Sequence, residues 1–221
     1  MRTRLAVFDL DGTLIDSRRD LADSANEMLA GYGAAPLSDD HIASMVGCGA
    51  PTLVKRVLAA GGVNAPVDEA LPRFLSAYDA RLTHHTRPYD GIPELLDDLR
   101  SRDTAMALLT NKPREQSVRI LDAFGLVKYF PWVVGGDGPL PRKPAPDGMR
   151  FLMTQASAGP SETVLIGDSM IDLETSRNAG VRVCLARYGF GFADLPATDL
   201  RGDESLVDTP AEISGVLHAR R

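Results

Sequence analysis

Cysteine is scarce in this sequence, and acidic residues outnumber basic ones. Only Cys48 and Cys184 occur among 221 residues, far apart and outside any CxxC motif, so we expect neither a disulfide framework nor a zinc site. The net charge of −6 is the opposite of the basic footprint of a nucleic-acid-binding protein. This composition argues against nucleic acid as a partner and fits a reducing, cytoplasmic location.

Long hydrophobic runs are missing as well. The apolar stretch before Asp9 covers only residues 5–8, which is too short for a signal peptide or a membrane span, so we expect no membrane partner. Hydrophobic residues still make up 44% of the chain and charged residues 24%, an ordinary balance for a globular protein with a sizeable core. A chain of this length forms one large domain, or one domain that carries a smaller inserted one.

Short apolar runs with little alternation are typical of strands that are buried on both faces of a parallel sheet. Such runs occupy residues 4–10, 104–110, 131–136, 163–168 and 181–186. Helical patterns lie between them, at residues 91–102, 113–126 and 146–157. The alternation of strands and helices predicts an α/β fold with a Rossmann-like parallel sheet as its core.

Residues 17–84 interrupt this alternation because they contain helical patterns only. Glycine and proline separate the patterns, and no strand-type run occurs for about seventy residues, far longer than an ordinary crossover. We therefore expect an all-helical cap domain at residues 17–84, inserted just after the first strand. Residues 1–16 and 85–221 then form the α/β core domain.

Polar residues follow several of the expected strands. Asp9 and Asp11 come at the end of the first strand, Thr110 ends the second, and Asp168 ends the fourth. Taken singly, each has an ordinary explanation, because Asp-Gly pairs make turns and Asp168 with Ser169 can cap a helix. Ligands bind beyond the carboxyl ends of the strands in an open parallel sheet. The joint occurrence of these residues at that edge therefore favours a binding site.

Carboxylates crowded at one edge need a counter-charge. Asp9, Asp11, Asp168 and Asp172 would repel one another strongly if they lay together. Asp172 lies four residues after Asp168, on the same face of a helix. A hard divalent cation removes that penalty, and Mg²⁺ is the usual choice beside phosphate. Lys143 would add positive charge for a phosphoryl group. Thr110 and the backbone N–H groups after it could bind phosphate oxygens.

Four motifs follow one another along nearly the whole chain. They are DLDGTLIDS at residues 9–17, LLTNKP at 108–113, GGDGPLPRKPAPD at 135–147 and IGDSMIDLETSRNAG at 166–180. In this order they resemble the haloacid dehalogenase superfamily, and within it the phosphoglycolate phosphatase-like hydrolases with a helical cap of the C1 type. The resemblance implies a phosphoric monoester hydrolase that acts on a small phosphorylated metabolite.

The resemblance also implies roles for single residues in the reaction. Asp9 looks like the nucleophile that becomes a phosphoaspartate. Asp11 looks like the general acid for the leaving alcohol and then the base for water. Thr110 and Lys143 look like binders of the phosphoryl group, and Asn111 assists them.

A Mg²⁺ ion is implied in the same way. Asp9, the main-chain carbonyl of Asp11 and Asp168 would hold the ion, and Asp172 would orient the metal's surroundings or the phosphoryl-binding lysine. Asp16, the third acid of the first motif, is expected to cap the first cap helix or to lie in the hinge, rather than to take part in catalysis.

The cap is expected to recognise the leaving group. Residues 45–58 resemble the family's glycine-bearing cap loop and the helix after it, and Gly49 could let the backbone approach the substrate. Lys55, or Arg18 beside the first hinge, could meet a second anionic group such as a carboxylate; the alternative is that both are solvated charges. Cys48 stands where family members commonly carry a polar residue, which leaves the natural substrate open.

Other functions share the same core motifs. A phosphosugar mutase of this superfamily forms the same phosphoaspartate and returns the phosphoryl group to an intermediate. A catalytically silent phosphate-binding regulatory module would keep the fold without the reaction, although every core position is filled here. Dehalogenases and phosphonate hydrolases lack the second acid of Asp-x-Asp, so Asp11 argues against both. A phosphatase is the leading interpretation, and the sequence leaves the oligomeric state open.

Overall fold

A parallel sheet forms the centre of the molecule in this computed structural model, which describes residues 3–219. Within that range the sheet has six strands. In spatial order they are β5 (Trp132–Val134), β4 (Ala105–Leu109), β1 (Leu5–Phe8), β6 (Thr163–Gly167), β7 (Arg182–Ala186) and β8 (Ser205–Val207). All neighbouring pairs are parallel, so the expected Rossmann-like sheet is confirmed.

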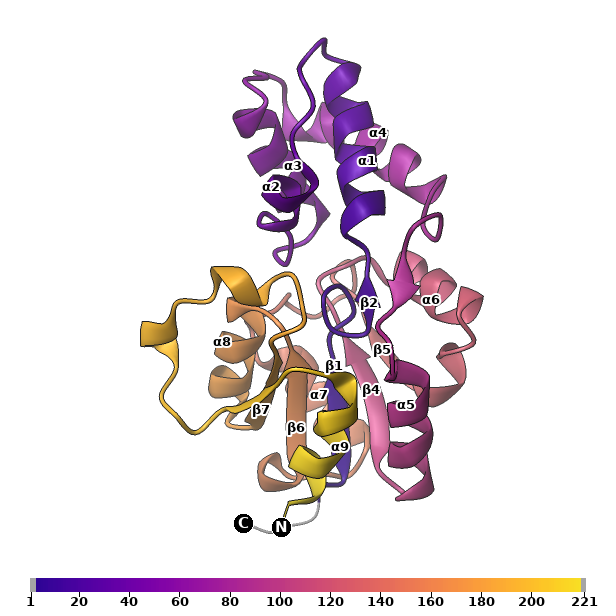
Figure 1. Ribbon diagram of the computed structural model, residues 1–221, viewed down its shortest axis with the longest axis vertical. Helices are drawn as coiled ribbons and strands as arrows, with labels where there is room; N and C mark the ends of the chain where they lie inside the picture. The colour runs from indigo at the N-terminus through magenta and orange to yellow at the C-terminus, as the bar shows by residue number, and fades with distance from the viewer. Residues whose placement is uncertain (1–2, 220–221) are drawn as a thin grey trace.

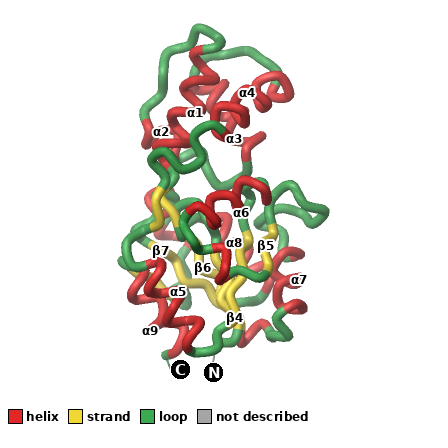
Figure 2. Tube along the Cα trace, turned by 90° about the vertical axis from the view of Figure 1, so that its right-hand side faces the viewer, coloured by secondary structure: helices red, strands yellow, loops and turns green. Residues whose placement is uncertain are grey.

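Helices cover both faces of this sheet, as Figure 2 shows. Alternate residues of β1 face opposite ways: Leu5 and Val7 join one apolar cluster, whereas Ala6 and Phe8 join another. One face is covered by α7 (Asp147–Gln155) and α8 (Met170–Ala179), and the other by α5 (Ile92–Ser101), α6 (Arg114–Ala123) and α9 (Pro210–His218). Burial on both faces explains why the strands lack an alternating polar pattern in the sequence.

Four further helices stand beyond the carboxyl ends of the strands (Figure 1). They are α1 (Arg18–Ala30), α2 (Asp39–Ala43), α3 (Ala50–Ala60) and α4 (Val67–Asp79). Their buried side chains, such as Leu29, Val57 and Phe74, pack together. The inserted all-helical cap is thus confirmed. Of the helices within residues 3–219, none combines the length and the hydrophobicity that crossing a membrane requires.

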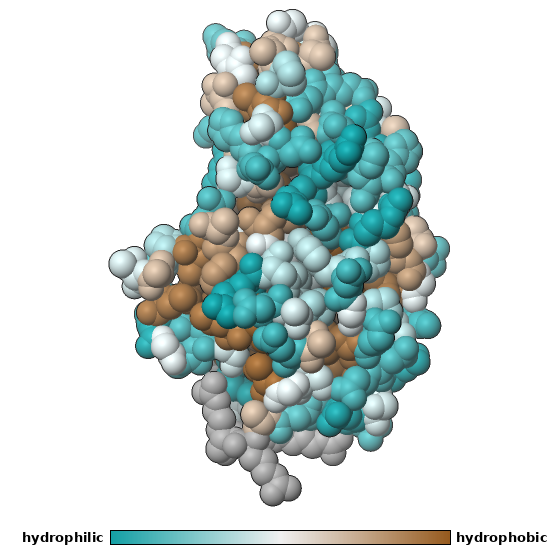
Figure 3. All heavy atoms as spheres, in the orientation of Figure 1, coloured by the Kyte–Doolittle hydropathy of each residue, from teal (hydrophilic) through white to brown (hydrophobic). Residues whose placement is uncertain are grey.

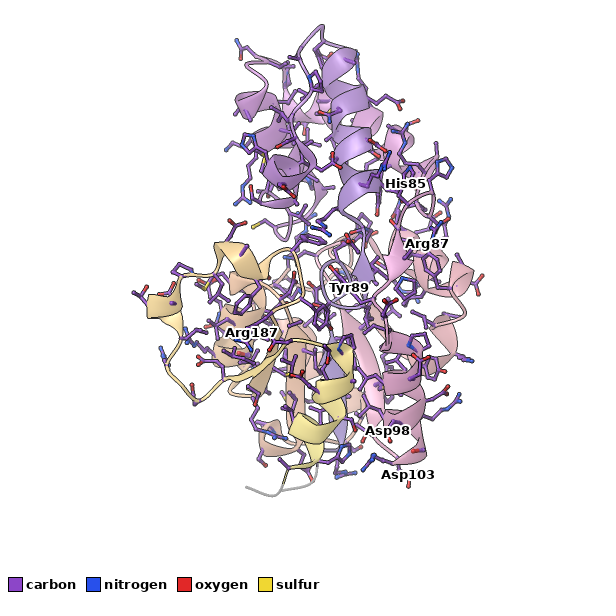
Figure 4. All side chains as sticks on the ribbon, viewed as in Figure 1. His85, Arg87, Tyr89, Asp98, Asp103 and Arg187 are labelled. Carbon is purple, nitrogen blue, oxygen red and sulfur yellow. The ribbon has the colours of Figure 1, made fainter. Side chains whose placement is uncertain are left out.

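The chain enters and leaves the cap through two short strands that pair with each other. Strand β2 (Ile15–Asp16) runs antiparallel to β3 (Arg87–Pro88). Asp16 therefore lies in the hinge, one of its two expected positions. The labelled side chains of His85, Arg87 and Tyr89 mark the returning segment in Figure 4.

Asp20 fastens this hinge from the cap side. Its buried carboxylate accepts hydrogen bonds from the backbone N–H of His85 at 3.0 Å and from that of Thr86 at 2.8 Å. The hydroxyl of Thr86 donates a third bond at 2.8 Å. The first turn of α1 is therefore tied to the segment by which the chain returns to the core.

Candidate active site

Asp9 directly follows β1, the strand at which the sheet order reverses. Strands β4 and β6 flank β1. After β1 the chain forms β4 and β5 on one side of it and later β6, β7 and β8 on the other. A crevice opens at the carboxyl end of β1, where the strand order changes direction. The backbone N–H of Asp9 donates to the carbonyl of Ile166 at 2.9 Å. This bond extends the pairing of β1 with β6 by one residue and fixes the backbone of Asp9, whose side chain is buried.

Lys143 lies between two carboxylates. Its Nζ is 2.9 Å from Asp9 Oδ1 and 2.7 Å from Asp172 Oδ1. The other oxygen of Asp172 accepts bonds from Ser169 Oγ at 2.6 Å and Ser169 N at 3.1 Å, at the start of α8. Burial opposes the charged form of Lys143, but Asp172 and Asp9 outweigh it and raise the pKa of the ammonium group.

Asp9, Asp168 and Asp172 form a buried acidic cluster, in which one carboxylate oxygen of each lies within 4.8 Å of the others. Burial raises the pKa of Asp9 to about 6, against the opposing charge of Lys143. Burial, with the charges of Asp172 and Asp9, raises the pKa of Asp168 well above its usual range. The cluster thus holds three carboxylates, of which Lys143 contacts two. The remaining negative charge and the oxygen donors fit a divalent cation such as Mg²⁺.

Backbone encloses Asp168 closely. The N–H of Gly191 donates to Asp168 Oδ2 at 2.8 Å. A Cβ atom at Gly12 or at Gly189 would clash with the side chain of Asp168, and Gly12 also has a φ of +83°, which favours glycine. The glycine after the two acids of the first motif is therefore required by this close approach.

Asp11 is paired with a lysine that the sequence analysis did not single out. Lys112 Nζ lies 2.8 Å from Asp11 Oδ1 and 2.9 Å from Oδ2, and Ser17 Oγ donates to Oδ1 at 2.6 Å. The same ammonium group lies 4.5 Å from the ring centroid of Tyr78 on α4. Burial opposes the charge on Lys112, but Asp11 raises its pKa. The only sequence signal for Lys112 is its place directly after Thr110 and Asn111.

Thr110 and Asn111 follow β4 and are both buried. The backbone N–H of Thr110 donates to the carbonyl of Val134 at 3.0 Å, which prolongs the pairing of β4 with β5. Asn111 Nδ2 donates to the carbonyl oxygens of Gly47 and Lys143, both at 2.9 Å. The amide of Asn111 therefore connects the cap loop with the segment that carries the phosphoryl-binding lysine.

A single pocket joins most of the residues predicted from the sequence. Those that line it are Asp9, Asp11, Gly49, Thr110, Asn111 and Asp168. Lys143 and Asp172 lie directly behind Asp9 through the ion pairs described above. Phe190 and Gly191, from the loop after β7, border the same pocket.

The structure does not bring Arg18 or Lys55 to this pocket. Arg18 forms a two-point ion pair with Asp16, with Nε and Nη2 at 3.0 Å and 2.6 Å, and lines a groove on the outside of the hinge. Lys55 is exposed, because Val54 and Val57 occupy the buried face of α3 and turn it outward. This placement does not support substrate binding by either residue.

Comparison with known proteins gives a consistent assignment. A family model described as haloacid dehalogenase-like hydrolase matches residues 6–186. The chain is 39% identical over 226 residues to a phosphoglycolate phosphatase of Pseudomonas fluorescens strain Pf0-1, covering 96% of this chain and 82% of that protein. It is 36% identical over 212 residues to a phosphoglycolate phosphatase of Agrobacterium fabrum, covering 94% and 89%.

A solved structure agrees with these relatives. The crystal structure of a protein described as a predicted phosphoglycolate phosphatase from Haemophilus somnus has a TM-score of 0.91 to this chain at 27% identity. The superposition covers 98% of each chain. The similarity therefore includes the cap as well as the sheet.

Proposed function

Since the chain belongs to the haloacid dehalogenase-like hydrolases and is a phosphoric monoester hydrolase, we propose that it hydrolyses small phosphate monoesters with Mg²⁺, through a phosphoaspartate on Asp9. The observation that carries this proposal is the position of Asp9. Its carboxylate lies at the end of the central strand, 2.9 Å from Lys143 Nζ, and in one pocket with Asp11 and Asp168.

The reaction has two half-reactions. An oxygen of Asp9 attacks the phosphorus atom and the bond from phosphorus to the ester oxygen breaks. Asp11, released from Lys112 and protonated by solvent before this step, gives its proton to the departing alcohol. Asp11 then takes a proton from water, whose oxygen attacks the phosphorus and breaks the bond to Asp9. Inorganic phosphate leaves, and both aspartates return to their starting states. Thr110 and Lys143 bind the phosphoryl oxygens, and Asn111 holds this segment in place.

Asp9, the main-chain carbonyl of Asp11 and Asp168 would hold the Mg²⁺, and Asp172 would orient Lys143 beside them. The bound ion supplies positive charge that offsets the phosphoryl oxygens and the clustered carboxylates. The raised pKa of the Asp168 carboxyl supports this assignment, because burial and the neighbouring carboxylates disfavour its charged form, which a cation would stabilise.

We assign catalysis and substrate contact to two different parts of the chain. Residues 1–16 and 85–221 form the catalytic core, and residues 17–84 form the cap, which contributes Gly49 to the substrate pocket. The four helices between β2 and β3 support this division. A cytoplasmic location, expected from the composition, stays a prediction.

Released phosphate tests the proposal. The purified chain is incubated with p-nitrophenyl phosphate and a panel of small phosphate esters, with Mg²⁺ or with a chelator. We expect turnover only with Mg²⁺, and a loss of at least about a thousandfold in Asp9→Asn, whose amide keeps the shape but cannot attack phosphorus. Asp68→Asn, an exposed change on α4, is the matched control. Full activity of Asp9→Asn, or full activity in the chelator, would contradict the mechanism.

A further inference from the structure

The wall that the cap contributes to the pocket is apolar. It is formed chiefly by Leu21, Val46, Leu53, Phe74, Leu75 and the ring of Tyr78, whose hydroxyl is buried. Among the described residues of the cap that line the pocket, none carries a charge. Apolar side chains are also visible at the waist between the cap and the core in Figure 3. Asp9 lines the same pocket as this wall, so the alcohol of an ester attacked by Asp9 would lie against it.

The cations near this space have other partners. Lys112 is the sole cation among the described residues that line the pocket, and both oxygens of Asp11 already hold its ammonium group. Arg56 is exposed and donates to the carbonyl of Met45 at 3.0 Å. Arg142 is not among the lining residues; its Nε donates to the carbonyl of Gly136 at 2.5 Å, and its Nη1 lies behind Gly49, 3.3 Å from where a Cβ atom would stand.

A carboxylate on the leaving alcohol would therefore be placed against the hydrocarbon of the cap wall, and the one cation among the described lining residues, Lys112, is already paired with Asp11. Burying such a charge unpaired is costly, whereas burying a methyl or methylene group against the same wall is favourable. We propose that the alcohol part of the substrate is uncharged and largely apolar, and that esters with a carboxylate there are poor substrates. This inference rests on the proposed phosphatase function and specifies its substrate class.

The inference implies that phosphoglycolate, after which the relatives are named, is a poor substrate for this chain. Phosphoglycolate and ethyl phosphate make a matched pair, because they differ in carrying a carboxylate or a methyl group at the same position. We expect kcat/KM to be at least about tenfold higher for ethyl phosphate. Along the series from methyl to butyl phosphate, each methylene buried against the wall should raise kcat/KM by roughly fourfold until the pocket is filled.

A charge placed in the wall provides an independent test. Leu75 lines the pocket and is only half-buried, so Leu75→Lys can extend an ammonium group towards the leaving group without a buried cavity. We expect the ratio of kcat/KM for phosphoglycolate to that for ethyl phosphate to rise by about tenfold or more. Ser76→Lys adds the same charge at the neighbouring exposed position of α4 and should leave the ratio unchanged.

The outcomes separate the two proposals. Preference of the wild-type chain for phosphoglycolate over ethyl phosphate would overturn the apolar assignment and leave the phosphatase function standing; loss of that preference in Arg142→Ala would identify the cation responsible. An equal rise of the ratio in both lysine variants would also count against a specific wall. If no ester is hydrolysed, p-nitrophenyl phosphate included, the phosphatase function and the substrate class fail together. The comparison of the two esters needs no variant, so a misfolded Leu75→Lys does not affect it.

Discussion

The ammonium group of Lys112 lies 2.8 Å and 2.9 Å from the two carboxylate oxygens of Asp11. Asp11 follows the central strand, Lys112 follows β4, and the ring of Tyr78 from cap helix α4 covers the same ammonium group. Two core segments and the cap thus meet at one positive charge. The environment of the proposed acid–base residue therefore depends on where α4 lies.

Replacing Lys112 by methionine should lower the free energy of unfolding by about 3 kcal/mol, because removal of one partner from a buried ion pair leaves the other charge unpaired. Both side chains are largely buried, with exposed fractions of 5% and 11%. Urea unfolding of wild type, Lys112→Met, Asp11→Asn and the double variant measures the coupling. The double variant should lose clearly less stability than the sum of the two single losses, and strict additivity would argue against the pair.

The metal-free protein should lose stability as the pH rises. A carboxyl group with a raised pKa in the folded state stabilises the fold below its unfolded pKa of 3.8, and this contribution is lost as the pH rises through the folded value. That value is about 6 for Asp9, and the pKa of Asp168 is also raised, well above its usual range. Melting temperatures in a chelator should therefore fall from pH 4 to pH 7 more steeply for wild type than for Asp168→Asn.

Mg²⁺ should restore at neutral pH the stability that the wild type loses in a chelator. We expect millimolar Mg²⁺ to raise the melting temperature of the wild type, because an ion that binds only the folded chain stabilises it. Asp168→Asn should melt above the metal-free wild type at pH 7.5 and gain little from the ion. An equal Mg²⁺-dependent rise in both proteins would place the ion elsewhere.

Replacing Asp20 by alanine should destabilise the hinge. The change leaves the buried N–H of Thr86 and the N–H of His85 without their acceptor, which we expect to cost about 3 kcal/mol. Asp23→Ala removes a carboxylate one turn later on α1, where it forms an ion pair of 3.9 Å with Arg19 at partly exposed positions. Such pairs contribute about 0–1 kcal/mol. Chemical denaturation should therefore show a much smaller loss of unfolding free energy for Asp23→Ala than for Asp20→Ala.

Asn111→Ala should weaken the contact between the cap loop and the core. The variant loses two donated hydrogen bonds, to the carbonyls of Gly47 and Lys143, and we expect kcat/KM for any accepted ester to fall by about tenfold or more. Cleavage of the cap loop in limited proteolysis should become faster as well. Asn64→Ala, at an exposed cap position, is the control, and an equal effect of both changes would show that the bridge is unimportant.

The sequence was sufficient for those features that depend on burial and strand order. Apolar runs revealed the strands that are covered on both faces, and the rule that ligands bind at their carboxyl ends brought Asp9, Thr110 and Asp168 together. Strand β8 was missed because Ser205–Val207 is only three residues long and has acidic neighbours. Its flanking helix α9 was missed with it.

The remaining features depend on side-chain direction, which the sequence encodes within a regular helix but not in loops. The outward position of Lys55 could have been inferred, since the apolar residues of α3 recur at helical spacing on the opposite side. Arg18 pairs with Asp16 only because the backbone turns between them. The contact of Lys112 with Asp11 joins loops 101 residues apart in the chain, and no local pattern predicts such a meeting.

The central place of β1 also determines when it can find its partners during protein synthesis. Its two sheet neighbours begin at Ala105 and Thr163, and at roughly 5–20 residues per second the ribosome needs about 5–20 s after β1 to reach the nearer one. Helices α1–α4 are completed within that interval and can pack with one another first. The nascent chain therefore carries four helices that can pack together next to an apolar strand that stays unpaired, and exposed, until β4 follows.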